Sequence, residues 1–130
     1  MRQPDARAFL FDIQMACQLI REFTSGMTFQ DYAEDRKTRS AVERQLEIVG
    51  EAIGQMLRAF PEMGQEIPDA TRIIAFRNRL IHGYASVSNP VVWGILEGDL
   101  PGLAAKVDEL LATNPGGRSD DERYKGSCGR

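Results

Sequence analysis

The 130-residue sequence lacks the features that define several large classes of protein. No apolar run approaches the roughly 18 residues of a membrane-spanning helix. Pro4, Asp5 and Asp12 interrupt the stretch where a signal peptide needs a basic start and an apolar core. The two cysteines, Cys17 and Cys128, lie far apart in the chain. We therefore expect a cytoplasmic protein with reduced thiols and no membrane contact.

Histidine is scarce as well, because His82 is the only one in the chain. One histidine and two distant cysteines do not make a zinc site. The sequence also has neither a glycine-rich phosphate loop nor a Ser/His/Asp set, so we expect no bound metal and no cofactor. Its net charge of -3 argues against indiscriminate binding to nucleic acid.

No useful stretch alternates between apolar and polar residues, and apolar residues recur instead at helical spacing. This spacing predicts helices over 5–24, 28–35, 39–60 and 69–82, and a further one from 89 through 111 that restarts or kinks near Asp99 and Pro101. The fold class is therefore all-α, a bundle of four to six helices over residues 1–113. Its core is small, which favours dimerisation. Residues 114–130 are rich in Gly, Ser and charge and are predicted to be a disordered polar tail.

The predicted helix 39–60, which we expect Thr38 to cap, contains two glycines four residues apart, Gly50 and Gly54. Glycine inside a helix costs about 1 kcal/mol relative to alanine. Two glycines on one face therefore suggest that another helix or a ligand comes close to this face.

Residues 70–96 form the one long segment without Asp or Glu, and they carry Arg72, Arg77, Arg79 and His82. In an acidic chain, this distribution suggests a site for an anion. Histidine is the side chain most easily tuned to exchange protons near neutral pH. Arginine presents a planar fork that matches phosphate oxygens.

The spacing of these residues leaves their geometry open. At about 100° per residue, Asn78 and His82 share a helix face, whereas Arg77 and His82 lie roughly 140° apart. One straight helix therefore does not direct both groups at one small ligand. Gly83 could loosen the last turn and bring His82 round, or two copies of the chain could pool their residues in one cleft.

Such a pair of groups suits RNA cleavage without a metal. Histidine can remove the proton from a ribose 2′-OH or protonate the leaving 5′-oxygen. Arginine can stabilise the charge that builds on the phosphate. RNA supplies its own nucleophile, so the protein needs neither a nucleophilic side chain nor a cofactor.

The motif Arg77…His82-x-Tyr84, with Asn78 directly after the arginine, occurs in order with several further segments. These segments are Phe29-Gln30-Asp31-Tyr32, Asp35–Arg39, Ala41–Ala52, Val92-Trp93 and Asp99-Leu100-Pro101. Together, over about residues 5–113, they resemble the HEPN ribonuclease superfamily and, within it, the HepT-like branch. Two positions depart from the family pattern, because Asp69 stands where Trp is frequent and Ala75 where glycine is common.

The resemblance implies an all-helical bundle that forms a homodimer or a higher even oligomer, with Arg77 and His82 of both chains in one cleft. It also implies a toxin ribonuclease paired with a nucleotidyltransferase antitoxin. In that branch the antitoxin is thought to attach AMP to the tyrosine of the motif, here Tyr84. Asn78 belongs to the same motif and is grouped with the catalytic residues.

Other readings remain open for the remaining cations and for the function. Arg36, Lys37 and Arg39 could contact RNA, although an exposed helix start has the same composition. Arg79 could join them or simply lie on a solvated face. The alternative function is a non-catalytic helical dimer that binds a nucleotidyltransferase, and only the enzyme requires Arg77 and His82 together.

Overall fold

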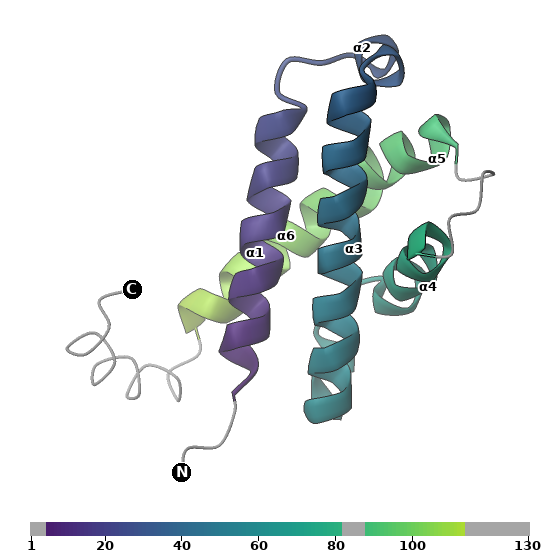
Figure 1. Cartoon of the computed structure of the whole chain (residues 1–130). Coiled ribbons are helices and arrows are strands. Elements are labelled where there is room, and N and C mark those ends of the chain that lie inside the picture. Colours follow the sequence, from purple (N-terminus) through teal and green to yellow (C-terminus); the bar gives the residue numbers. More distant parts are fainter. Residues whose placement is uncertain (1–4, 82–87, 114–130) are drawn as a thin grey trace.

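The computed structural model describes residues 5–81 and 88–113, and over them the chain is a bundle of helices (Figure 1). Its helices are α1 (Ala6–Phe23), α2 (Phe29–Glu34), α3 (Arg36–Ala59), α4 (Ala70–Ile81), α5 (Asn89–Gly94) and α6 (Leu100–Thr113). A 3₁₀ turn, η1 (Pro61–Gln65), follows α3, and a π-helical turn, η2 (Ile95–Asp99), joins α5 to α6. The predicted all-α class is confirmed. Within the described ranges, no helix has the length and hydropathy to cross a membrane. The predicted tail, 114–130, lies outside them.

The centre of the bundle is formed by the two long helices α1 and α3, which run side by side (Figure 1). Helix α6 crosses behind them in this view and contacts α1, whereas α4 lies against α3. Both long helices bury one apolar face, as their spacing predicted. The buried residues are Leu10, Ile13, Ala16, Cys17 and Ile20 on α1, and Val42, Leu46, Val49, Gly50, Ala52, Ile53 and Met56 on α3.

Side chains cap the starts of these helices and thereby define where they begin. Thr28 and Asp31 form a capping box on α2. Helix α3 begins earlier than predicted, because Asp35 rather than Thr38 is its cap. Asp35 accepts hydrogen bonds from the Thr38 backbone N–H (3.0 Å) and hydroxyl (2.9 Å). These bonds hold the pKa of the Asp35 carboxyl below its usual range.

An aromatic cluster joins α2 to α5. The ring of Trp93 lies 5.3 Å from that of Tyr32 and 6.2 Å from that of Phe29, measured between ring centroids. Tyr32 is fully buried, and its hydroxyl has no hydrogen-bond partner within residues 5–81 and 88–113. Burial therefore raises the pKa of this phenol. Trp93 packs against the core.

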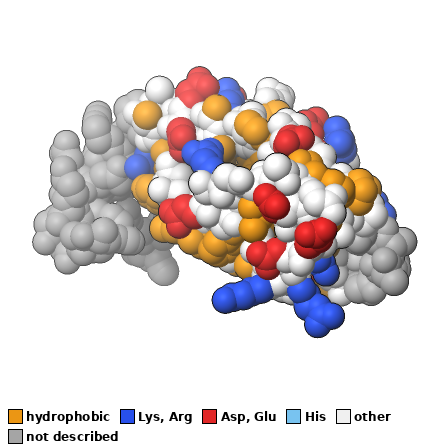
Figure 2. Space-filling model, turned by 90° about the horizontal axis from the view of Figure 1, so that it is seen from above, with side chains coloured by type: hydrophobic (Ala, Val, Ile, Leu, Met, Phe, Trp, Pro, Cys, Tyr) orange, Lys and Arg blue, Asp and Glu red, His pale blue; other side chains and the backbone are white. Residues whose placement is uncertain are grey.

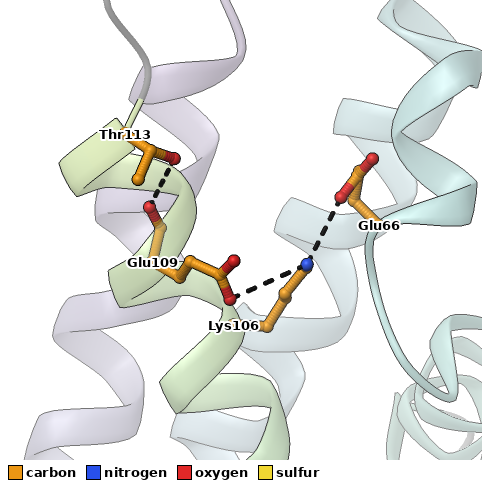
Figure 3. A network of polar contacts seen from close by, with 4 residues as sticks. All are labelled: Glu66, Lys106, Glu109 and Thr113. Atoms are coloured by element: carbon orange, nitrogen blue, oxygen red, sulfur yellow. Dashed lines mark hydrogen bonds and ion pairs between the residues drawn. The ribbon is translucent and has the colours of Figure 1, made fainter.

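A polar network ties α6 to the segment that leads into α4 (Figure 3). Lys106 Nζ lies 3.4 Å from a carboxylate oxygen of Glu66 and 3.8 Å from one of Glu109. The Thr113 hydroxyl donates to the backbone carbonyl of Glu109 at 2.8 Å. Glu66 lies between η1 and α4, so its ion pair with Lys106 joins the segment that precedes α4 to α6.

Candidate functional site

Helix α4 carries the described part of the predicted motif. It packs on α3, and its buried residues are Ala70, Ile73 and Phe76. Arg77 follows Phe76 at the border of this buried face, where its side chain is partly buried. The apolar spacing of α4 thus places the arginine between the core and the surface.

Gly50 is the point at which α3 meets this arginine. A Cβ atom built on Gly50 would lie 2.3 Å from Arg77 Cβ, 2.7 Å from Arg77 Cγ and 3.5 Å from the Ile73 carbonyl oxygen. The close helix approach expected from the two glycines is therefore correct for Gly50. It is wrong for Gly54 within the described part of the chain, where the nearest atom to a built Cβ is Arg58 Nη1 at 3.8 Å. Sequence reasoning did not connect Gly50 to Arg77.

The polar end of Arg77 is held by its neighbour in the chain. Nη1 donates a hydrogen bond to Asn78 Oδ1 at 3.0 Å. Nε is buried and has no acceptor among the described residues. Among residues 5–81 and 88–113, no carboxylate forms an ion pair with Arg77, whereas Arg72 on the same helix lies 3.3 Å from a carboxylate oxygen of Asp99. Arg77 thus keeps a positive charge that the described residues do not neutralise.

The start of α4 is also unusual. Asp69, which precedes the helix, has a φ of 58°, a left-handed conformation that is uncommon for residues other than glycine. Asp99 lies opposite and pairs with Arg72. Burial raises the pKa of Asp99, the charge of Arg72 opposes this rise, and the nearby carboxyl of Asp69 adds to it.

The other half of the motif follows directly from α4. The last described residue of this helix is Ile81, which is exposed. His82, Gly83 and Tyr84 come next in the sequence and lie outside the described residues. The juxtaposition of Arg77 and His82, and the position of Tyr84, therefore stay predictions.

The predicted RNA-contacting cations lie elsewhere on the chain. Arg36 and Lys37 are exposed at the start of α3, and Arg39 Nη1 donates to the Ala33 carbonyl oxygen. From Arg36 to Gly50 the rise along a helix is about 21 Å, so one chain does not bring this group beside Arg77.

Arg79 is exposed on α4. Two residues from Arg77, it lies about 200° around the axis, on another side of the helix.

Figure 2 shows that the face seen from above carries Lys and Arg side chains at its lower edge with Asp and Glu close by. This face therefore mixes both signs of charge.

The described residues favour neither thiol chemistry nor metal binding. Cys17 is buried, and burial raises the pKa of its thiol to about 12, so it is not an activated nucleophile. No group of three or more His, Cys, Asp or Glu side chains within 5–81 and 88–113 is arranged to hold a metal ion. The polar groups that α4 offers at the candidate site are therefore the guanidinium of Arg77 and the side-chain amide of Asn78.

The described residues define a helical-bundle protein with a partly buried arginine on a helix that packs against the core. The comparisons with known proteins make the assignment specific. The chain belongs to the ribonuclease HepT-like family, whose model matches residues 13–110. The resemblance drawn from the sequence is thereby confirmed. The matched range includes both Gly50 and Arg77.

Relatives agree with this assignment over most of their length. A protein of Thermococcus cleftensis named "Probable ribonuclease HepT" is 39% identical over 102 residues, which cover 78% of this chain and 92% of the relative. A candidate RNase of Methanocaldococcus jannaschii is 32% identical over 111 residues, covering 85% and 91%. A candidate RNase of Caldanaerobacter subterraneus subsp. tengcongensis is 31% identical over 105 residues, covering 81% and 93%. No solved structure matches the chain.

Proposed function

We propose that this protein is a metal-independent endoribonuclease in which Arg77 and His82 cleave RNA. The observation that carries the proposal is the state of Arg77. Its stem is packed on α3, Asn78 holds its polar end, and no described carboxylate neutralises it. An arginine kept in this way is ready to bind a phosphate. Membership of the ribonuclease HepT-like family supports the same substrate class.

The proposed reaction uses the nucleophile that RNA itself provides. His82 accepts the proton of a ribose 2′-OH, and the 2′-oxygen forms a bond to the adjacent phosphorus. The bond from phosphorus to the 5′-oxygen breaks, and that oxygen takes up a proton to become a 5′-hydroxyl. Arg77 stabilises the negative charge that builds on the phosphate oxygens. The other product is a 2′,3′-cyclic phosphate.

Asn78 has a distinct task in this scheme. Asn78 Oδ1 accepts a hydrogen bond from Nη1 and so orients the guanidinium. Because the amide is neutral, it leaves the positive charge of Arg77 in place, whereas a carboxylate would neutralise it. Of the five N–H groups of an arginine, one then points to Asn78 and one lies on the buried Nε. The rest remain available to the phosphate.

The proposal extends to assembly. We propose a homodimer or a higher even oligomer in which two copies of Arg77 and His82 share one cleft, since a straight helix separates the two groups by roughly 140°. In such an assembly, Arg36, Lys37, Arg39 and Arg79 would contact the RNA backbone beyond the cleft.

Control is proposed to come from a nucleotidyltransferase antitoxin that attaches AMP to Tyr84 and silences this toxin. Tyr84 lies two residues after His82 in the sequence. An AMP group there would bring a negative phosphate that competes with RNA for Arg77. Intact-mass analysis after co-expression tests this idea, because modification adds the mass of AMP and Tyr84→Phe removes the addition. If the partner silences Tyr84→Phe as well as the parent, control is by occlusion instead.

Cleavage of a short linear RNA labelled at one end tests the catalytic proposal. The parent should cut in excess EDTA and leave a 2′,3′-cyclic phosphate. His82→Ala and Arg77→Ala should each lose activity by about 10²–10⁴-fold with an unchanged far-ultraviolet circular dichroism spectrum. Arg21→Ala, at an exposed position of α1, is the matched control and should cut at the parent rate.

Four outcomes would count against parts of this proposal. Cutting by His82→Ala at the parent rate would remove the histidine from the mechanism. Loss of all activity in EDTA with full recovery in Mg²⁺ would reject metal independence. A chain that cuts nothing yet binds a nucleotidyltransferase as a dimer would favour the non-catalytic alternative. Light scattering that finds a monomer still able to cut would reject the shared cleft.

A further inference from the structure

We propose that Gly50 is a positioning residue for the candidate site, because its missing side chain lets α4 lie close enough to α3 to fix the stem of Arg77. The inference rests on the catalytic role proposed for Arg77 and assigns a cause to the placement of that arginine. Gly50 touches neither RNA nor the reacting atoms in this scheme. It acts only through Arg77.

The contact leaves no room for even one methyl group. A Cβ on Gly50 would lie 2.3 Å from Arg77 Cβ, and carbon atoms in contact prefer about 3.5–4.0 Å. Arg77 Cβ is attached directly to the α4 backbone, so rotation of the arginine side chain cannot relieve the overlap. An alanine at position 50 would therefore force α4 away from α3 by about 1 Å or more.

The packing of the stem reaches along the side chain as far as Nε. Within the described part of the chain this atom is buried and lacks an acceptor, which is costly for a polar group. The guanidinium beyond it donates a hydrogen bond to Asn78 Oδ1. An arginine side chain normally loses rotamer entropy when it is fixed. At Arg77, folding has already restricted the stem before any RNA arrives.

A misplacement of the size that alanine would impose matters for a reaction that depends on orientation. A shift of about 1 Å in a catalytic group can reduce the rate by 10²-fold. Binding of RNA through other cations would be affected less. The inference therefore predicts a fall in kcat with little change in KM.

Gly54 provides a matched control on the same helix. It lies four residues after Gly50, and the nearest atom to a Cβ built there is the flexible end of Arg58 at 3.8 Å. Gly54→Ala therefore adds the same methyl group at a place where nothing has to move. Any effect of helix propensity is the same at both glycines.

The test measures cleavage of the same short linear RNA by variants of the full chain. Gly50→Ala should lower kcat by about 10²-fold with KM within threefold of the parent, and Gly54→Ala should retain the parent values. Gly50→Ala added to Arg77→Gly, which lacks both overlapping atoms Cβ and Cγ, should cause no further loss relative to Arg77→Gly under single-turnover conditions. This last result separates positioning of the arginine from general damage.

The outcomes distinguish this inference from the proposed function. If Arg77→Ala cuts at the parent rate, the catalytic role of Arg77 fails. If Arg77→Ala is inactive but Gly50→Ala cuts like Gly54→Ala, only the positioning role is rejected. If the double variant falls by the same further factor as Gly50→Ala alone, the effect is general damage, and the positioning role is rejected as well.

A second measurement decides the matter even if Gly50→Ala does not fold. Nitrogen-15 relaxation of the arginine Nε–H groups in the parent reports how far each stem is restricted on the picosecond-to-nanosecond timescale. The Arg77 group should be about as rigid as the backbone, whereas that of the exposed Arg79 should be mobile. Equal mobility at Arg77 and Arg79 would overturn the inference.

Discussion

Helices α1 and α4 both flank the central helix α3, but they are packed to different depths. The buried residues of α1 are 0–2% exposed, whereas Ala70, Ile73 and Phe76 of α4 are 6–9% exposed. Helix α1 starts at Asp5 with an extended backbone, and α4 starts after Asp69 with a φ of 58°. The helix that carries the candidate site is thus the less deeply packed one, as is common for functional elements.

The largest expected effect compares the same substitution on the two helices. Ile13→Ala on α1 should reduce the free energy of unfolding by about 2–5 kcal/mol, because it leaves a cavity at a fully buried position. Ile73→Ala on α4 should cost less, since Ile73 is 6% exposed and its surroundings can close in. Urea unfolding of both variants checks this order. An equal or larger loss at Ile73 would break the comparison.

Next in size are substitutions at the two helix starts, which should have opposite signs. Asp5 Oδ1 accepts from the Arg7 backbone N–H at 2.7 Å, so Asp5→Ala should destabilise the fold by about 0.5–2 kcal/mol. Asp69→Gly should stabilise it by about 1 kcal/mol, because glycine adopts a positive φ without steric cost. Thermal unfolding of each variant measures the sign. Destabilisation by Asp69→Gly would show that the carboxyl outweighs the backbone strain.

A smaller effect is expected from the ion pair that holds α4 to η2. The side chain of Arg72 is 69% exposed, so Arg72→Gln should cost only about 0.2–1 kcal/mol. Burial raises the pKa of Asp99, and the positive charge of Arg72 partly offsets this rise. Its contribution to stability is therefore present below the unfolded pKa and lost as the pH rises through the folded pKa.

Removing Arg72 should raise the pKa of Asp99 further and extend that loss of stability to higher pH. Urea unfolding of the parent, Arg72→Gln and Asp99→Asn, from about pH 3 to pH 7, measures the slopes. Asp99→Asn should remove this part of the pH dependence. An unchanged slope in Asp99→Asn would show that another carboxyl is responsible.

The smallest expected effect is at the far end of the chain. Arg7 Nη1 donates to the Leu111 carbonyl oxygen at 3.1 Å, so α1 and α6 are joined before residue 114. Removing 114–130 should therefore leave the melting temperature and the oligomeric state unchanged. Differential scanning calorimetry and light scattering test this. A clear fall in melting temperature would show that the segment docks on the bundle.

The sequence predicted the elements well because their signals are local. Apolar residues at helical spacing located α1. Helix α2 begins with a capping box whose two residues, Thr28 and Asp31, are only three positions apart in the sequence. Competing local signals were harder to resolve. Asp35 and Thr38 are both good caps, and only the backbone conformation decided for Asp35.

Contacts between distant segments could not be predicted in the same way. The spacing of Gly50 and Gly54 indicated a close approach, but nothing in it identified which glycine or which partner. The overlap with Arg77 depends on the angle at which α4 crosses α3, which follows from the packing of the whole core. For His82 and Tyr84, which lie outside the described residues, the motif alone supports the assignment.

The π-helical turn η2 has a consequence for how the chain tolerates changes in length. A π turn is a place where a helix accommodates one extra residue without unwinding. Deleting one residue within Ile95–Asp99 would let α5 run into α6 as a continuous α-helix, but it would rotate α6 by about 100° relative to α5. Leu100, Leu103 and Val107, which are buried, would then turn out of the core. The one extra residue in this turn therefore sets the rotation of α6 relative to α5, and with it the side of α6 that is buried.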